Sequence, residues 1–562
     1  MKIKNILIIA LALFVLFTAA GCSDDSQKSD TSQNKEISKQ IYNEQRKQGI
    51  DIKQLNDVKN DTSKIYEANY QKDKKTQIET LKKKRKYTMK SPLLVENPYG
   101  TISNGLYIFF RTKRERSFEY KVSTEGYPDY KAKLNNGRNN NLSTEHEYML
   151  LGAIPGEKNV ITLYKLNKKG KRVRSVKFRF VPEKIKNDYG YQKQVEDGKS
   201  HQKLSNGLYV MFRNDITKSS GGICTVMFDN EGVVRCIIPI INYRTNRLLF
   251  DKEGMYLEVS RNKIVRMEPT GYVNRIYDTG IYNLHHDMIF GKKNDLLVCA
   301  TTRDSDVEED MIISVNLESG KVAEFIDMKK LLSDYYDNAV WGDYRGILDW
   351  IHINSLEFTS DGGLLISARE TSTIIKVKEP YGSKNIDYLI GSKKFYKKTE
   401  YKTKVLKKIG KFSLQGGQHS LQVINDESLK NGQYYLVLYN NNYTNSTYGA
   451  TLYNWRNDKN YYNQGFTKSG KGENVVSYYY KYLVDEKRRT VKLVDSIDVK
   501  YSSILSSAQV YKENIITLSG NPHVINEFDS DGKLIRRFIS PSKGYTYRCY
   551  KYDFDKFWFY NK

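Results

Sequence analysis

The chain has 562 residues and carries 91 lysines and arginines against 65 aspartates and glutamates, a formal net charge of +26. This length exceeds what one hydrophobic core normally supports, so we expect at least two domains. Apart from Cys22, the cysteines are scattered without the close spacing of a disulfide framework or a zinc site, which argues against both.

The start of the chain has the pattern of an export signal. Lys2 and Lys4 precede an apolar run over residues 6–17, and small residues stand directly before Cys22. The run is too short to span a bilayer comfortably, and a cysteine after small residues is typical of bacterial lipoproteins. We therefore predict a signal peptide over residues 1–21 and an extracytoplasmic protein anchored to the cell membrane by a lipid on Cys22. A transmembrane helix is the alternative.

Export changes the meaning of the positive charge. A net charge of +26 usually suggests nucleic acid, but an exported protein rarely meets it. We therefore expect no nucleic-acid partner and favour anionic substrates, cell-wall polymers or the membrane surface.

Two segments of different character follow the signal. Residues 22–35 lack the apolar content to pack, which predicts a flexible tether. Over residues 36–90, apolar side chains such as Ile37 and Ile41 recur at helical intervals. This spacing predicts a helical segment.

Residues 91–184 change to short alternating stretches such as SFEYKVST and VRSVKFRFV, broken by Gly, Asn and Asp. The pattern predicts a small antiparallel β-sandwich of the immunoglobulin-like kind. Nothing in it suggests chemistry, and His146 is interpreted as a packing residue.

Residues 195–562 repeat one theme, a strand followed by a Gly- or Asn-marked turn and a strongly apolar second strand, as in GLYVMFR, NDLLVCATT and GGLLISAR. We count six units of about four strands each, which matches the period of propeller blades. The sequence therefore predicts an all-β fold, a six-bladed β-propeller preceded by the sandwich and the helical segment. A sandwich or a β-helix is the alternative, because the spacing is uneven and residues 443–474 form a long insert.

Histidines concentrate in the propeller region. Four of the seven fall in three short segments that each open a repeat unit, namely HHD at 285–287, DWIHINS at 349–355 and QHS at 418–420. Equivalent positions on the innermost strands of neighbouring blades converge on the channel axis. The pattern therefore indicates a functional cluster rather than separate structural histidines.

The apolar strands that follow these segments give an alignment. HDMIF, NSLEF and HSLQV superpose, so His286, Asn354 and His419 occupy the same place in three consecutive blades. His352 lies two residues before Asn354, on the same face of a strand. Arg369 closes the strand GGLLISAR and is placed to reach the same mouth with donors that suit a sulfate or carboxylate.

Three chemistries could use this cluster. Imidazoles with Asp349 nearby could hold zinc or copper, but no compact ligand pair is present and the guanidinium of Arg369 would repel a cation, so no metal is expected. The second is anion binding without turnover. The third is covalent transfer, in which a neutral imidazole attacks and the other groups hold the charged group.

The segments HHD, DWxHxNS, LLISAR and QHS, in this order, resemble the signature of bacterial aryl-sulfate sulfotransferases. The preceding module, with ENPYGT and TEHE, is similar to the N-terminal β-sandwich of that family, so the resemblance covers nearly all of the chain from Pro92 onward. It implies transfer of a sulfonate from a phenolic sulfate ester to a phenol, without a nucleotide sulfate donor and without a cofactor. Together with the N-terminal sequence, the resemblance implies a lipoprotein form of this family.

The resemblance also implies roles. His419 would be the nucleophile that becomes a sulfohistidine, while Arg369, His352 and Asn354 would bind the sulfonyl oxygens and stabilise their charge. Two half-reactions at one site imply ping-pong kinetics. No cysteine lies near QHS, unlike family members with a disulfide close to the nucleophile.

Further candidates complete the predicted site. The blade alignment favours His286 as the inward histidine of its pair, with His285 kept as an alternative. The family uses a hydroxyl residue from the last blade, and Ser503 and Ser506 are the candidates for substrate binding. Trp350 either stacks on phenols or belongs to the core.

Two other functions remain open at this point. One is a non-catalytic cell-surface propeller that binds anionic wall polymer or a protein, since folds do not fix function. The other is a metal-dependent hydrolase or lyase. A homodimer is possible, and nothing in the sequence decides it.

Overall fold

The structure is a computed structural model that describes residues 25–561 except for 48–49, 56–57, 59–60, 136–140, 186–189, 215–222, 338, 340–345, 445–452, 473 and 542–544. The side chains of residues 25–35 are not described either. The predicted signal peptide and Cys22 lie outside the described residues. Within the described part, no helix combines the length and the apolar character needed to cross a bilayer.

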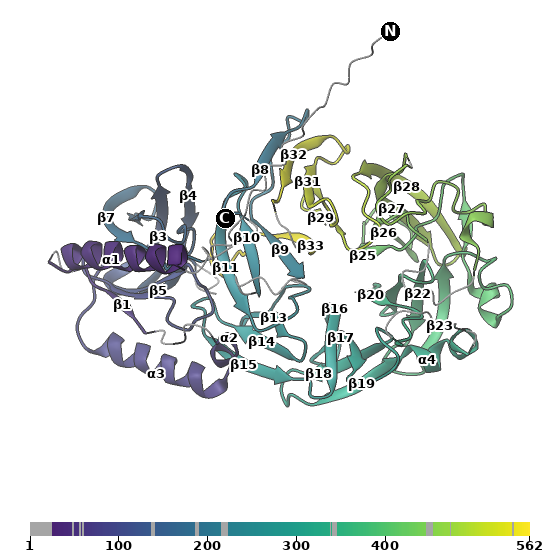
Figure 1. Cartoon of the computed structure of the whole chain (residues 1–562), viewed down its shortest axis with the longest axis horizontal. Helices are drawn as coiled ribbons and strands as arrows, with labels where there is room; N and C mark the ends of the chain where they lie inside the picture. The colour runs from purple at the N-terminus through teal and green to yellow at the C-terminus, as the bar shows by residue number, and fades with distance from the viewer. Residues whose placement is uncertain are drawn as a thin grey trace, which may run out of the picture.

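The molecule is a ring of six β-sheets with a smaller β-sandwich at its side (Figure 1). The predicted all-β fold with a six-bladed propeller is therefore confirmed, and the sheet and helices that precede it agree with the predicted sandwich and helical segment. The C-terminus ends between the two parts (Figure 1).

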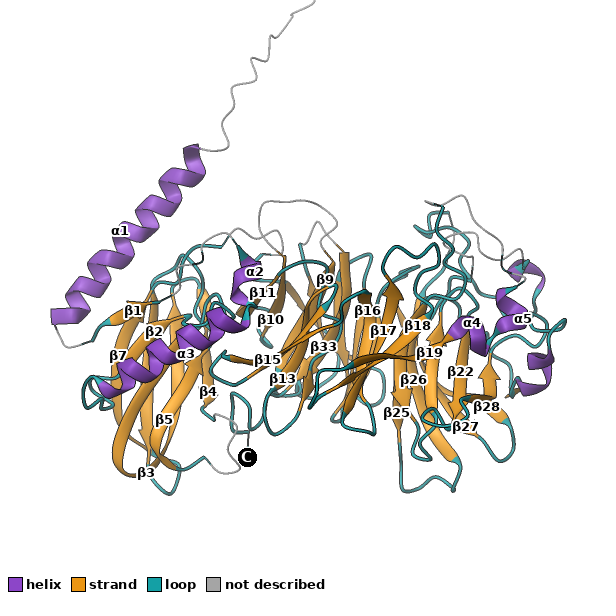
Figure 2. Cartoon of the chain, turned by 90° about the horizontal axis from the view of Figure 1, so that it is seen from below, coloured by secondary structure: helices purple, strands orange, loops and turns teal. Residues whose placement is uncertain are grey.

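Helices at the start of the chain lie beside the sandwich, but the first of them touches it only near one end and projects away from the body of the molecule (Figure 2). They are α1 (Asp25–Lys47), α2 (Thr62–Ile65) and α3 (Ala68–Lys83). The flexible tether predicted for residues 22–35 is wrong from Asp25 onward, because this stretch continues α1. Ile41 and Tyr42 are buried and fix the helix, and a polar sequence can extend a helix that its next turns anchor.

Gln71 of α3 ties the sandwich to the propeller. Its amide donates to the carbonyls of Ile65 (2.7 Å) and Tyr99 (3.0 Å), and its Oε1 accepts from the backbone N–H of Val273 (3.0 Å). A buried amide with all three partners in place fixes how the two parts meet.

The sandwich is built around one long strand that serves both of its sheets. Its strands are β1 (Ile52–Gln54), β2 (Leu93–Glu96), β3 (Leu106–Thr124), β4 (Tyr127–Lys133), β5 (Ser143–Leu150), β6 (Asn159–Leu166) and β7 (Arg172–Phe180). The first part of β3 pairs with β2 and β5, and the second part pairs with β4 and β6. Pairing with β5 shifts register between Arg111 and Arg116, where β3 passes from one sheet to the other.

The first three blades each follow the chain in order. Blade I is β12 (Leu249–Phe250), β13 (Met255–Ser260), β14 (Lys263–Met267) and β15 (Val273–Asp278). Blade II is β16 (Tyr282–Phe290), β17 (Asp295–Thr302), β18 (Met311–Asn316) and β19 (Val322–Asp327). Blade III is β20 (Ile353–Phe358), β21 (Leu364–Ala368), β22 (Thr373–Lys378) and β23 (Asn385–Ile390).

The other three blades recruit strands from elsewhere. Blade IV is β25 (His419–Ile424), β26 (Gln433–Asn440), β27 (Ser477–Asp485) and β28 (Thr490–Val499), with β24 (Lys407–Ile409) outside. Blade V is β29 (Ser507–Tyr511), β30 (Asn514–Ser519), β31 (Val524–Phe528) and β32 (Leu534–Ile539), with β8 (Gln194–Asp197) outside. Blade VI is β33 (Tyr545–Tyr552), β9 (Leu208–Asn214), β10 (Ile223–Phe228) and β11 (Val234–Ile240).

Short helices lie in the connections between blades. They are α4 (Met328–Leu331), α5 (Ser333–Tyr336) and the 3₁₀ turns η1 (Glu400–Lys404) and η2 (Trp455–Asn457).

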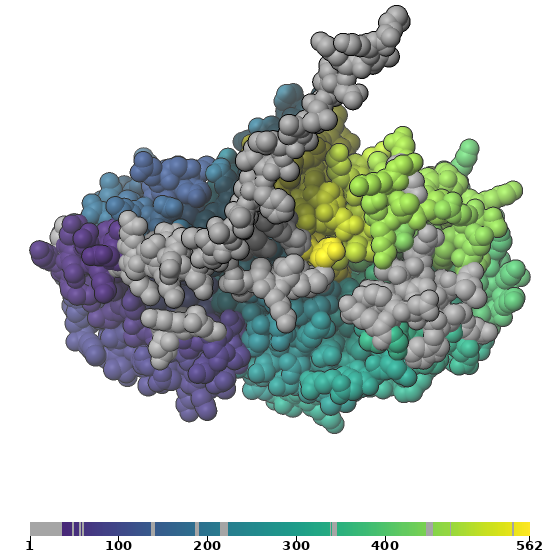
Figure 3. Space-filling view, viewed as in Figure 1, coloured from purple at the N-terminus to yellow at the C-terminus, as the bar shows by residue number. Residues whose placement is uncertain are grey.

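Both ends of the propeller sequence close the ring. The last strand β33 is innermost in blade VI and pairs with β9, while β8 pairs with the outer strand of blade V. In the space-filling view the C-terminal part of the chain, in yellow, reaches the centre of the visible face (Figure 3). Closure pairs strands that would otherwise leave open sheet edges.

A repeated hydrogen bond joins the innermost strands. In four blades one polar side chain accepts the backbone N–H of the next inner strand, namely Asp287 from Leu356 (3.0 Å), Ser355 from Leu421 (2.9 Å), Ser420 from Ala508 (3.2 Å) and Ser507 from Cys549 (3.0 Å). Asp287, Ser355 and Ser420 directly follow His286, Asn354 and His419. Their shared role supports the alignment that placed those three residues in equivalent positions.

Candidate active site

The predicted histidine segments lie on the inner strands of blades II to IV. His286 is on β16, His352 directly precedes β20, and His419 begins β25. His286 and His352 have φ values of 55° and 52°, a left-handed backbone that non-glycine residues rarely adopt. Such conformations cluster at functional sites, where the surrounding structure enforces them.

The structure brings the imidazoles together. The ring of His286 lies 4.7 Å from that of His352 and 4.9 Å from that of His285, measured between centroids, and the two Nδ1 atoms of the pair are 2.8 Å apart. Tyr547 of β33 borders the group, at 5.3 Å from His286 and 6.3 Å from His419. All of these histidines are buried. Both members of the HHD pair therefore belong to the cluster.

His352 is held between two carboxylates. Its Nδ1 lies 2.5 Å from Oδ2 of Asp349 and forms an ion pair with Glu309. Burial and the charge of Arg369 lower the pKa of His352, but the two carboxylates outweigh them and raise it to about 9. His352 is therefore an imidazolium at neutral pH, a charged donor inside the cluster.

His419 has the opposite character. Burial, and next the positive charge of Arg369, hold its pKa well below the usual range, so the ring is neutral. Its Nδ1 lies 2.8 Å from Oδ1 of Asn441, whose amide nitrogen donates to the carbonyls of Ser502 (2.7 Å) and Leu505 (3.0 Å). With both amide hydrogens used, Oδ1 can only accept, so Nδ1 of His419 carries the proton and Nε2 keeps its lone pair.

Arg369 follows β21 and is anchored beside His352. Its backbone N–H donates to the carbonyl of His352 (3.1 Å), and its guanidinium pairs with Glu370, with Nε at 2.9 Å from Oε1. Nη2 also lies 3.7 Å from Oδ2 of Asp349. The guanidinium is buried, so its charge acts on the cluster with little screening by water.

Asn354 is buried and partly committed to the backbone. Its Nδ2 donates to the carbonyl of Gln418 (2.8 Å), which leaves one amide hydrogen for a ligand, and its Oδ1 has no hydrogen-bond partner among the described residues. The backbone carbonyl of Asn354 accepts from Arg548 (2.6 Å). An unsatisfied buried oxygen next to charged groups is typical of a site that a ligand completes.

Trp350 does not face the cluster. It is fully buried against Tyr335 and Tyr336, at centroid distances of 5.7 and 5.2 Å, and its Nε1 donates to Asp310 (3.3 Å). The stacking role is therefore wrong and the core alternative is right. Trp350 belongs to the apolar cluster that also contains Tyr335.

The hydroxyls of the two candidate serines bind other groups of the protein. Ser503 donates to the carbonyl of Lys468 (2.8 Å), and Ser506 donates to Ser502 (3.0 Å) and accepts from the N–H of Gly520 (3.0 Å). Neither hydroxyl bonds to an imidazole in the contacts found among the described residues, and the substrate contact of these serines stays a prediction. The loop that contains these serines contributes to the site indirectly, because its backbone carbonyls at Ser502 and Leu505 orient the amide of Asn441.

Sequence reasoning missed Glu309, Asn441, Tyr547 and Arg244, which all border the imidazoles. Glu309 and Arg244 lie in loops, where no repeat marks a position. Only the asparagine run NNN at 440–442, after a strand of the QHS blade, gave a signal that could have pointed to Asn441.

Two sets of side chains are close enough to share a cation. Glu309 belongs to both, once with His285 and His286 and once with Asp349 and His352, with ligand atoms within 4.8 Å of one another. The same atoms already pair as imidazolium and carboxylates, and Arg369 lies next to Asp349. The donor atoms of the second set therefore already have partners within the protein.

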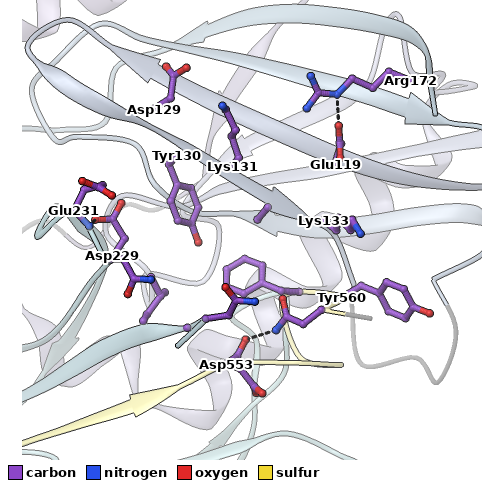
Figure 4. Close-up of a pocket in the computed structure, with 17 residues that line it drawn as sticks. Glu119, Asp129, Tyr130, Lys131, Lys133, Arg172, Asp229, Glu231, Asp553 and Tyr560 are labelled. Atoms are coloured by element: carbon purple, nitrogen blue, oxygen red, sulfur yellow. Dashed lines mark hydrogen bonds and ion pairs between the residues drawn. The ribbon is translucent and has the colours of Figure 1, made fainter. Parts of the chain in front are cut away.

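A cavity of about 600 Å³ lies between the sandwich and blade VI, away from the histidines (Figure 4). Its carboxylates are already paired, for example Glu119 with Arg172 and Asp229 with the buried Arg235. A polar lining with satisfied charges fits a gap between two parts of the molecule better than a reaction site.

The sequence from residue 193 to 548 matches the family model described as arylsulfotransferase (ASST). This covers more than half of the chain, and the matched part carries the histidine cluster. The chain belongs to the arylsulfotransferase family. At the family level it is therefore a sulfotransferase that uses a phenolic sulfate as donor and a phenol as acceptor.

The other comparisons add nothing to this assignment. No curated protein matches the sequence significantly. A putative 6-phosphogluconolactonase from Bacteroides fragilis has 11% identity and a TM-score of 0.35, covering 78% of this chain and 98% of its own. A catalytically inactive virginiamycin B lyase from Staphylococcus aureus has 10% identity and a TM-score of 0.28, covering 62% and 99%. Scores this low carry no argument about function.

Proposed function

We propose that this protein transfers a sulfonate from a phenolic sulfate ester to a phenol by a ping-pong mechanism, through a sulfohistidine on His419 and without a nucleotide donor. The observation that carries the proposal is the contrast between two neighbouring imidazoles. His419 is neutral with a free lone pair on Nε2, whereas His352 is charged. A nucleophile and a proton donor thus coexist in one buried site.

In the first half-reaction Nε2 of His419 attacks the sulfur of the ester. The S–N bond forms as the S–O bond to the aryl group breaks, and the leaving phenolate takes the proton of the His352 imidazolium. The ring of His419 becomes positive, and Oδ1 of Asn441 stabilises its Nδ1–H. The products are sulfohistidine, a free phenol and neutral His352.

The second half-reaction reverses these roles. Neutral His352 takes the proton of the acceptor phenol, whose oxygen attacks sulfur as the S–N bond breaks. A new aryl sulfate leaves, and His419 and His352 return to their first states. Charge on the sulfonyl oxygens is stabilised by Arg369 and by the free amide hydrogen of Asn354, which are present before the reaction starts.

The test is turnover of para-nitrophenyl sulfate by the full-length protein, with and without added phenol and in the presence of a chelator. We expect phenol-dependent release of nitrophenol that ignores the chelator and disappears in His419→Ala. The matched control is His201→Ala, because His201 is exposed and outside the cluster. Loss of activity in chelator would favour a metal-dependent enzyme, and no turnover by the wild type would favour a binding propeller.

We also propose that the enzyme works outside the cytoplasm, anchored by a lipid on Cys22. The support is the N-terminal sequence, with its short apolar run and the small residues before the cysteine. Metabolic labelling with a fatty acid should mark the wild type and not Cys22→Ser. Equal labelling of both forms would refute the anchor.

A further inference from the structure

Arg244 is a buried cation beside the histidines that the proposed reaction does not use. It lies in the loop between β11 and β12 and is only 3% exposed. Its Nε donates to Oδ1 of Asn246 (2.9 Å), while its Nη2 is buried and has no hydrogen-bond partner in the part of the chain that the structure describes. A buried guanidinium donor that is left unsatisfied is costly and needs an explanation.

The guanidinium lies one ring away from the imidazoles. Its Cζ stacks 3.8 Å from the centroid of Tyr547, the same ring that borders His286 and His419 at 5.3 and 6.3 Å. Its charge reaches the cluster, because after burial and His352 it contributes to the lowered pKa of His286. Arg244 therefore belongs to the edge of the same site.

Arg244 differs from the other buried cations of this region in its partners. Arg369 pairs with Glu370, His352 pairs with Asp349 and Glu309, and Arg548 pairs with Asp287 at 2.9 Å. Among the described residues no carboxylate forms an ion pair with Arg244. The nearest carboxylate in its hydrogen-bond chain is Glu258, which binds the far side of Asn246. Arg244 therefore has no direct counter-charge within the described part of the chain.

Arg244 and Arg369 reach the histidines from different parts of the ring. Arg369 follows β21 of blade III, and Arg244 lies in the connection from blade VI to blade I. The backbone of Arg369 binds His352, whereas the guanidinium of Arg244 stacks on Tyr547. Two cations held by different parts of the fold can bind two separate groups of one substrate.

We propose that Arg244 binds a second anionic group, a carboxylate or a sulfate, carried by the aromatic substrate whose sulfate or phenol group reacts at His419. This inference rests on the proposed function for the reacting end. Guanidinium groups bind carboxylate and sulfate oxygens in a planar, two-point arrangement, and stacking on Tyr547 holds this plane in place. The preferred substrates are thus aromatic compounds with two acidic groups.

A binding experiment tests the proposal without any turnover. Calorimetry on the full-length protein compares para-sulfobenzoate with para-toluenesulfonate, which differ only in a carboxylate and neither of which can transfer its sulfonate. We expect wild-type protein to bind the sulfobenzoate at least about tenfold more tightly, and Arg244→Gln to abolish this preference. Equal affinity of the wild type for both compounds would overturn the proposal.

Kinetics give a second readout. With para-nitrophenyl sulfate as donor, kcat/KM is measured for para-hydroxybenzoate and for para-cresol. The ratio of the two values should fall about tenfold or more in Arg244→Gln and recover partly in Arg244→Lys. A ratio that stays constant while both values fall would assign Arg244 a structural role and overturn the proposal.

Arg261→Gln is the matched control, because Arg261 is exposed and stacks on Tyr243 as Arg244 does, at 4.4 Å. For Arg261→Gln, the ratio of kcat/KM for para-hydroxybenzoate to kcat/KM for para-cresol should equal that of the wild type. Thermal melting of each variant checks that it is folded. If the wild type shows no phenol-dependent turnover, the proposed function fails, and the calorimetric comparison still decides the role of Arg244.

Discussion

Oδ1 of Asn441 lies 2.8 Å from Nδ1 of His419, and the amide of Asn441 is fixed by two backbone carbonyls. This contact sets the tautomer of the proposed nucleophile. Replacement by Ala would let the ring adopt the other tautomer or turn, so we expect Asn441→Ala to lower kcat by about 10- to 100-fold, which corresponds to ~1.4–2.8 kcal/mol.

Single-turnover formation of the sulfated enzyme is the measurement, since it isolates the attack by His419. Thermal melting of the variant separates this effect from loss of fold. An unchanged rate of enzyme sulfation in Asn441→Ala would contradict the assigned role.

The alkaline limit of activity should depend on His352. Because its pKa is raised to about 9, kcat/KM for the sulfate donor should hold up to about pH 9 and fall above it, as the imidazolium loses its proton. Glu309→Gln removes one of the carboxylates that favour the charged ring of His352. The pH above which kcat/KM falls should therefore decrease by about one unit or more. Glu308→Gln, one residue earlier in the same loop, should leave it in place.

Stability should fall on the acid side for a different reason. Burial lowers the pKa of His285 to about 4 and holds those of His286 and His419 well below 6.5. The unfolded chain takes up these protons near pH 6.5 while the folded protein does not, so the free energy of unfolding falls as pH drops below about 6.5. Urea unfolding at pH 7.5, 6 and 5 measures the slope, which His286→Gln should reduce.

Asp287 should matter more for stability than any serine of the same series. Its carboxylate binds the buried Arg548 (2.9 Å), Arg247 (3.0 Å) and two groups of blade III. Asp287→Asn leaves Arg548 without a counter-charge and Arg247 with only Glu357, at 3.7 Å, so it should destabilise the protein by about 3–5 kcal/mol. Ser420→Ala, at the equivalent position of blade IV, should cost only about 1 kcal/mol in the same urea experiment.

Trp350→Ala should reveal a core residue. Removing an indole that is packed on Tyr335 and Tyr336 should cost about 3–5 kcal/mol of stability. Trp350→Phe keeps most of the packing and should leave the KM for phenol close to that of the wild type. A large rise in this KM in a stable Trp350→Phe protein would restore the stacking role.

Repetition decided what could be predicted from the sequence. His286, Asn354 and His419 were placed together because a blade recurs, and the residue after each of them repeats one hydrogen bond to the next strand. Glu309 and Arg244 could not be found in this way, since loops between strands share no spacing. For Trp350 the sequence left stacking on phenols and a place in the core open, and only its burial in an apolar cluster distinguishes the two.

The helix α1 shows a related limit. Composition predicts that residues 25–35 lack the apolar content to pack, but it does not say whether a helix that is anchored further along extends through them. Local sequence also cannot tell that β8 leaves its neighbours to join blade V, because that pairing spans more than three hundred residues.

The position of β33 has a consequence for how the enzyme matures. This strand is near the end of the chain, and it supplies both the innermost strand of blade VI and the Tyr547 ring that borders the histidines. Contacts of such long range form late, after a large loop has closed. Sealing the ring and placing Tyr547 beside the histidines therefore depend on one and the same strand pairing, that of β33 with β9.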